Sequence, residues 1–151
     1  MQYYERWFLK KKVGLNPISL EEAKSRHERN KGYCVLIENT AIVDIAGDWV
    51  SVNFIDEFLR PYLNYDFKKI YEDQLFLKGA IYREYEGNTD EIVASVVFNF
   101  KENGSYIAEK DGAECKSIEG NAPITDLLDS YPKFGVYDHL LQIERGVPDL
   151  A

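Results

Sequence analysis

Three strand-like segments joined by short turns constrain the fold of this chain more than any other feature. The segments QLFLKGAIYREYEG (74–87), EIVASVVFNF (91–100) and SYIAEK (105–110) are rich in β-branched and aromatic residues. Gly87–Asp90 joins the first two, and Asn103-Gly104 joins the last two. The Asn-Gly pair predicts a type I′ hairpin, in which both turn residues need positive φ. Because no helical pattern lies between these segments, we predict an antiparallel meander and not a parallel βαβ arrangement.

Earlier segments extend the predicted sheet. YCVLIE (33–38) is a continuous apolar run, WVSVNFID (49–56) alternates apolar and polar residues, and YLNYDF (62–67) follows Pro61. The alternation predicts that two sets of side chains face the core: Val50, Val52 and Phe54, and Ile92, Ala94, Val96, Phe98 and Phe100. We expect a curved sheet of about six to eight strands.

One helix is predicted near the N-terminus. Ser19 is a good N-cap, Glu22 stands three residues later as in a capping box, and Gly32 is placed to end the helix. The predicted helix spans Leu20 to Lys31 and carries many charges, so we expect it on the surface, covering an edge or one end of the sheet.

The C-terminal part has weaker patterns. PITDLLDSYP (123–132) predicts a short helix with Thr125 as N-cap, ending near Pro132. YDHLLQIER (137–145) fits a strand or a helix, and we favour a strand. The predicted fold class is therefore α+β: a curved antiparallel meander with one N-terminal helix and a short C-terminal helix, in a single domain over residues 1–151.

The composition favours a protein partner over nucleic acid. The net charge is -8, which repels phosphate backbones but attracts a basic protein. The chain has 11 Tyr and 8 Phe, and such rings suit both strands and protein interfaces. We find neither a signal-peptide pattern at the N-terminus nor an apolar run that could span a membrane, so we expect a cytoplasmic protein.

The sequence predicts no catalytic, cofactor or metal site. Cys34 lies seven residues after His27, but it falls within an apolar run where a buried structural thiol is expected. His27 lies among charged residues of the predicted helix, so we expect it to be solvated. Asp138 and His139 would point to opposite faces of a strand, and Cys115 has no paired cysteine spacing.

Acidic residues near tyrosines are the predicted partner contacts. The candidates are Asp56, Glu57, Tyr62, Asp66, Glu84 and Glu86. The aromatic series has two interpretations, cross-strand packing, which we favour, and an exposed binding surface. Its members are Tyr62, Tyr65, Phe67, Tyr82, Tyr85 and Tyr106.

Several segments together resemble a known class of protein. They are RHERNKGYCVLIEN, VSVNFIDEFLRPYLNYDFKKI, LFLKGAIYREYEG and FGVYDHLLQIERG. They resemble small acidic bacterial immunity proteins of polymorphic toxin and contact-dependent growth inhibition systems. The resemblance implies a non-enzymatic inhibitor that binds a cognate toxin domain, with basic nucleases among the candidate toxins. Immunity proteins differ in fold and interface, so the resemblance implies no particular contact residues.

Two other functions remain open from the sequence. Aromatic strands and an early helix also fit a small-ligand-binding protein or enzyme, in which a curved sheet and helix enclose a pocket. An accessory subunit without inhibitory activity would differ only in its partner. An enclosed cavity faced by His27 or His139 would favour the ligand-binding protein, and a filled core beside an acidic surface would favour the immunity protein.

Overall fold

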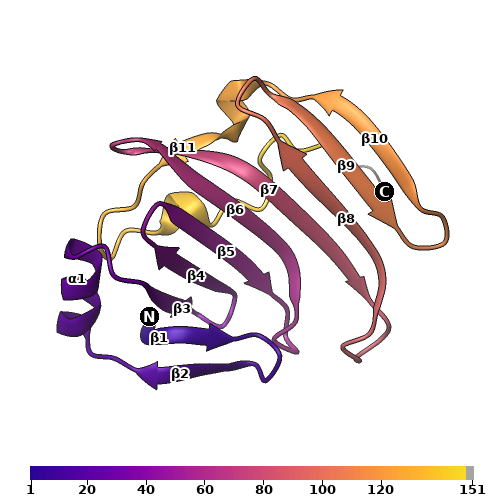
Figure 1. Ribbon diagram of the computed structural model, residues 1–151. Coiled ribbons are helices and arrows are strands. Elements are labelled where there is room, and N and C mark those ends of the chain that lie inside the picture. Colours follow the sequence, from indigo (N-terminus) through magenta and orange to yellow (C-terminus); the bar gives the residue numbers. More distant parts are fainter. Residues whose placement is uncertain (149–151) are drawn as a thin grey trace.

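Eleven antiparallel strands form one curved sheet in the computed structural model, which describes residues 1–148 (Figure 1). The strands are β1 (Gln2–Phe8), β2 (Val13–Pro17), β3 (Tyr33–Ile37), β4 (Ala41–Ala46), β5 (Trp49–Ile55), β6 (Pro61–Tyr71), β7 (Gln74–Tyr85), β8 (Ile92–Phe100), β9 (Ser105–Asp111), β10 (Lys116–Asn121) and β11 (Leu128–Ser130). Their order across the sheet is β10-β9-β8-β7-β6-β5-β4-β3-β1-β2, and β11 pairs with β7.

The predicted meander is confirmed from β3 to β10, where each strand pairs with the next in sequence. The expected number of strands was too low. The first 17 residues add a hairpin, β1–β2, whose first strand pairs with β3, and β4, β10 and β11 are further strands. In β1, β2 and β10, polar and apolar residues are mixed, and over five to seven residues they give too weak a periodicity to predict a strand.

The hairpin between β8 and β9 has a different turn from the predicted one. Gly104 has a φ of 90°, but Asn103 is not among the residues with positive φ, so the turn is not type I′. Lys101 N–H donates to the Ser105 carbonyl and Gly104 N–H donates to the Lys101 carbonyl, which gives a longer loop that needs only one left-handed residue.

One face of the sheet forms the main core. The alternation of Val50, Val52 and Phe54 is confirmed, since all three are buried. On β8 the prediction is correct only in part: Phe98 is 1% exposed, whereas Ile92 is 50% exposed. Ala94 and Val96, also predicted as core, are half-buried. The start of β8 pairs with the end of β7, beyond the area that the C-terminal segment covers (Figure 1).

Helix α1 (Leu20–Glu28) lies beside the β1–β3 edge of the sheet (Figure 1). Ser19 is its N-cap as predicted, accepting from Glu22 N–H. The predicted end was wrong, because Asn30 and not Gly32 supplies the left-handed residue, with a φ of 55°. Lys31 N–H donates to the Arg26 carbonyl and Asn30 N–H to the His27 carbonyl, which is a Schellman motif. Within residues 1–148, no helix is long and apolar enough to cross a membrane.

The C-terminal segment corrects two predictions. Residues 123–132 form a 3₁₀ turn, η1 (Ile124–Leu127), followed by β11, and the N-cap is Pro123 and not Thr125. Residues 137–145 contain no strand but the 3₁₀ turn η2 (Asp138–Leu140). In both places burial decides the conformation, since η1 buries Leu127 and η2 brings Leu140 next to buried Tyr137.

Residues 131–147, here called the C-terminal strap, cross the core face of the sheet (yellow in Figure 1). Tyr137 and Leu140 are buried in the main core. The Tyr65 hydroxyl donates to the Ile143 carbonyl, which joins the strap to β6. Arg145 pairs with Asp129 at 2.7 Å and lies over aromatic rings of β6. The strap therefore takes the place of a second sheet over the core.

We predict that Leu140→Ala destabilises the protein by about 2–5 kcal/mol, because it removes a fully buried side chain and leaves a cavity. Ile143→Ala is the matched control in the strap, since Ile143 is 51% exposed and contributes its carbonyl. It should change stability by about 0.5 kcal/mol or less. Urea unfolding measures both, and equal losses would show that Leu140 does not anchor the strap.

A second prediction concerns Gly104, whose left-handed φ is combined with close packing. A Cβ at this position would lie 2.4 Å from the Ala122 carbonyl oxygen, whereas one at Gly47, with a φ of 63°, would meet nothing within 4 Å. Gly47→Ala should therefore cost only backbone strain, about 1 kcal/mol, and Gly104→Ala clearly more. The difference in free energy of unfolding between the two variants measures the steric contribution.

Candidate functional site

The turns at one end of the sheet form a connected surface. The turns β1–β2, β5–β6 and β7–β8 lie at this end (Figure 1), here called the turn end. Lys12 in the first turn pairs with Asp90 in the last at 2.8 Å. Five predicted contact residues lie in or next to these turns: Asp56, Glu57, Tyr62, Glu84 and Glu86.

Arg60 holds two of these turns together. Its guanidinium donates to Asp56 at 2.8 Å, and also to the Gly87 and Thr89 carbonyls at 2.8 and 2.6 Å. The guanidinium lies 4.7 Å from the centre of the Tyr85 ring, a cation–π distance. Arg60 is only 8% exposed, so its guanidinium is largely shielded from water. The β5–β6 and β7–β8 turns are therefore fixed relative to each other.

Asp56 is a structural carboxylate and not a free contact. Burial alone would raise the pKa of Asp56, but hydrogen bonds from Arg60 and Phe58 N–H, together with the Arg60 charge, lower it below its usual value. The carboxylate is thus charged but already paired. It can shape a binding surface at the turn end, whereas its own charge is largely neutralised.

The remaining candidates occupy different environments. Glu57, Glu84 and Glu86 are exposed, and Glu84 lies at the end of β7, two residues before Glu86. Tyr62 is half-buried against Phe54. Burial and the nearby Asp56 charge raise the pKa of Tyr62.

Asp66 lies apart from the others, on the outer face of the sheet. It is half-buried and accepts from the Ser51 hydroxyl on the neighbouring strand. The structure therefore brings Asp56, Glu57, Tyr62, Glu84 and Glu86 towards one end of the sheet, without Asp66.

Charge is unevenly distributed across the sheet. Residues 1–31 contain eight basic and four acidic side chains, whereas residues 32–151 contain ten basic and twenty-two acidic ones. The N-terminal residues form β1, β2 and α1 at one edge, and residues 86–121, with eight acidic and three basic side chains, form β8 to β10 at the other. The total charge does not reveal this segregation, but the charges of the separate segments do.

The aromatic series is used mainly for packing. Tyr65, Phe67 and Tyr106 are buried in the main core, and Tyr65 and Tyr82 meet edge to face. Tyr62, Tyr82 and Tyr85 are half-buried. The cross-strand packing interpretation thus describes the buried rings.

His27 is half-buried, and the expectation that it is solvated was wrong. Its Nδ1 lies 2.7 Å from the Tyr33 hydroxyl, which lies 3.0 Å from the Tyr137 hydroxyl in the strap. Burial lowers the pKa of His27, an effect opposed by the charge of Glu28. The charged neighbours of His27 in the helix do not reveal this burial, because the strap that covers His27 lies about a hundred residues later in the sequence.

The cysteines show no sign of nucleophilic activation. Cys34 is fully buried as expected, and burial, together with the Asp44 charge, raises its pKa to about 12. Cys115 is exposed, and the nearby Asp111 carboxylate raises its pKa. In the described part of the chain, no three His, Cys, Asp or Glu side chains come together in a group that could hold a metal ion.

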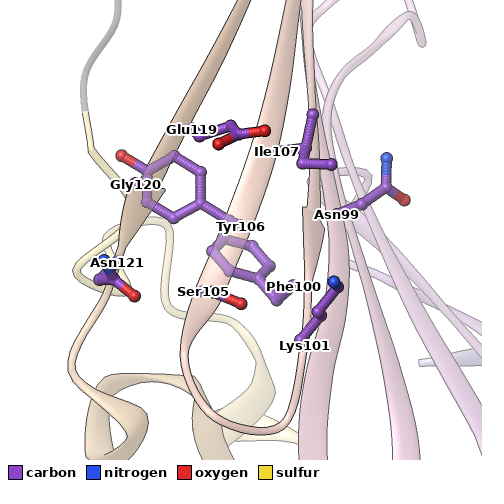
Figure 2. Close-up of a pocket in the computed structure, with 9 residues that line it drawn as sticks. All are labelled: Asn99, Phe100, Lys101, Ser105, Tyr106, Ile107, Glu119, Gly120 and Asn121. Atoms are coloured by element: carbon purple, nitrogen blue, oxygen red, sulfur yellow. The ribbon is translucent and has the colours of Figure 1, made fainter.

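Two hollows lie at opposite edges of the sheet. One, of about 380 Å³, is bordered by the ends of β8, β9 and β10, and Figure 2 shows the Tyr106 ring beside Gly120 there. The other, of about 490 Å³, is bordered by β1 and the segment before α1. Neither is lined by His27 or His139.

The Asp56–Arg60 pair predicts a pH dependence of stability. Because the pKa of Asp56 is lowered in the folded protein, its contribution is complete above the unfolded value of about 3.9 and is lost as pH falls towards the folded value. Asp56→Asn should therefore reduce stability at neutral pH, and its difference from the unsubstituted protein should shrink below about pH 3.9. Urea unfolding at several pH values measures this, and a constant difference would contradict it.

Comparison with protein-family models gives no match, and comparisons with curated proteins and with solved structures give none either. The function therefore has to be inferred from the surface chemistry of the chain itself.

Proposed function

We propose that the chain is an immunity protein that binds and neutralises a cognate toxin domain in the cytoplasm of the cell that makes it. The observation that carries this proposal is the segregation of acidic side chains into the β7–β10 half of the sheet. An acidic surface attracts a basic domain, speeds its association and discriminates against acidic partners. A basic nuclease is the kind of toxin that such a surface fits best.

The filled core supports inhibition by surface contact. Tyr137 and Leu140 occupy the inner face of the sheet, where a curved-sheet ligand pocket would lie. The hollows lie at the edges and lack histidine, so the small-ligand alternative has less support. An inhibitor of this kind needs only a rigid surface that covers the toxin's active site.

The turn end supplies rigidity and charge at the same place. Arg60 fixes the two turns, and Glu57, Glu84 and Glu86 are exposed beside them. We propose these three acids as contacts, with Asp56 and Tyr62 as the residues that shape the surface and Asp66 as a more distant contact. A fully covered acidic contact should contribute about 2–5 kcal/mol when truncated, whereas a rim acid should mainly affect the association rate.

The test uses the product of the gene directly upstream, expressed with and without this protein. We expect the two to co-purify and the protein to prevent growth arrest by that product. Failure of both would overturn the proposal.

A charge-reversal comparison then tests the surface. Glu84→Lys/Glu86→Lys changes the acidic half, and Glu21→Lys/Glu28→Lys makes the same change in net charge on the exposed side of α1. We expect the first pair to slow association about tenfold or more at low salt, and the second to have a much smaller effect. Equal effects would show that net charge matters and not this surface. Circular dichroism checks that both variants fold.

A further inference from the structure

Strand β10 forms one edge of the sheet, and among the described residues no strand pairs with its outer side. Within residues 1–148, β10 pairs only with β9, and it is the last strand at the acidic side of the sheet (Figure 1). An open strand edge is a row of unpaired N–H and C=O groups that can accept another strand.

The register identifies which backbone groups face outwards. Ala122 N–H donates to the Gly104 carbonyl, so this pair is hydrogen-bonded, and Tyr106–Gly120 and Ala108–Ile118 follow in the same ladder. Antiparallel strands alternate between residues that bond inwards and residues that bond outwards. The N–H and C=O groups of Ser117, Glu119 and Asn121 therefore point away from β9.

The opposite edge of the sheet is less suited to accept a further strand than the edge of β10. Strand β2 has only five residues, ends in Pro17, which lacks an N–H, and contains Asn16 with a φ of 53°. Between Lys116 and Asn121, β10 has neither proline nor a residue with positive φ.

Side chains along β10 define what would fit. Glu119 lies in one row with Ile107 and Asn99, and Ser117 lies opposite Glu109, so one face of this edge carries two carboxylates. The other face presents Ile118 and, two residues earlier on β10, Lys116 opposite Lys110. The hollow of about 380 Å³ shown in Figure 2 adjoins this edge.

We propose that an extended basic segment of the partner adds to β10 as a further antiparallel strand. Its basic side chains lie opposite Glu119, and its alternate apolar side chains face Ile118 and Gly120. This mode of binding gives affinity through main-chain hydrogen bonds and specificity through alternate side chains. The inference rests on the proposed function only in assigning the segment to a toxin domain.

A second copy of the chain fits this edge less well than a basic segment. Each copy has a net charge of -8, and residues 86–121 around the edge are predominantly acidic, so two such edges repel each other. The face of the edge that carries Glu109 and Glu119 therefore favours a basic occupant.

The probe is a capped peptide of alternating lysine and valine, titrated into the full-length protein and followed by amide hydrogen exchange in NMR. In the free protein, the outward amides of Ser117, Glu119 and Asn121 should exchange rapidly. With peptide they should exchange about tenfold or more slowly, because they become hydrogen-bonded. Protection elsewhere, or none at all, would overturn the inference.

Two methylated peptides test the geometry at constant charge. In an antiparallel hydrogen-bonded pair the two side chains share a face, so the lysine residues that lie opposite Glu119 direct their own N–H groups towards β10. A peptide N-methylated at its lysines should fail to protect the three amides, whereas one N-methylated at its valines should protect them. Equal behaviour of the two peptides would show that strand addition does not occur.

A variant pair makes the same test in the protein. Glu119→Ala removes the carboxylate but keeps the outward N–H, and Glu119→Pro removes both without removing a bond to β9. Binding of the lysine–valine peptide should weaken a few-fold in the first variant and be lost in the second. Equal binding of the peptide by the two variants would count against the inference. So would a size measurement showing that the protein dimerises under the conditions in which the amides are protected.

These results are separable from the proposed function. Neutralisation of the upstream product without peptide protection at β10 would leave immunity in place and remove strand addition. Peptide protection without neutralisation would leave strand addition in place and remove immunity.

Discussion

A single curved sheet must bury its apolar face, and every other feature of this structure depends on how that burial is achieved. Neither a second sheet nor a layer of helices is present in residues 1–148, where α1 lies at one edge. The C-terminal strap covers the face instead, with Tyr137 and Leu140 in the core and Arg145 over the Phe67 ring. A covering segment without regular structure leaves backbone groups to satisfy, and the Tyr65 hydroxyl meets one of them at Ile143.

Buried arginines hold together the parts of the chain that the sheet does not. Arg26 joins α1 to the Gly32 carbonyl, Arg60 joins two turns, and Arg145 joins the strap to Asp129. Each guanidinium can donate several hydrogen bonds in fixed directions, which suits it to irregular backbone. Because these cations are paired internally, they offer little positive charge to the surface. The buried arginines therefore do little to offset the acidic side chains on the surface of the β7–β10 half.

The sequence predicts the meander and the helix start well, because their signals are local. Asn103-Gly104 marks the β8–β9 hairpin even though the turn type differs, and Ser19 caps α1. Conformations imposed by distant contacts are not predictable in this way. Residues 137–145 look like a strand by composition, but the strap needs Tyr137 and Leu140 on one side of a 3₁₀ turn.

In the candidate site, too, local features can be predicted from the sequence, whereas contacts that depend on the folded chain cannot. Exposure of Glu57, Glu84 and Glu86 agrees with their charge, whereas the pairing of Asp56 depends on a turn that brings Arg60 back onto it. Alternation on β10 determines which amides are open, but only once the register is known. The uneven distribution of charge can be counted from the sequence alone. Only the strand order shows that the basic and acidic segments lie at opposite edges of the sheet.

The strap also has a consequence for how the protein is made. It follows every strand that it covers, and the Tyr33–Tyr137 contact joins residues 104 positions apart. During synthesis, the aromatic inner face therefore remains uncovered on the ribosome until the strap emerges, and contacts of such long sequence separation form slowly. We therefore expect the nascent sheet to be exposed to aggregation in that interval, and the strap to close over the sheet after its strands have paired.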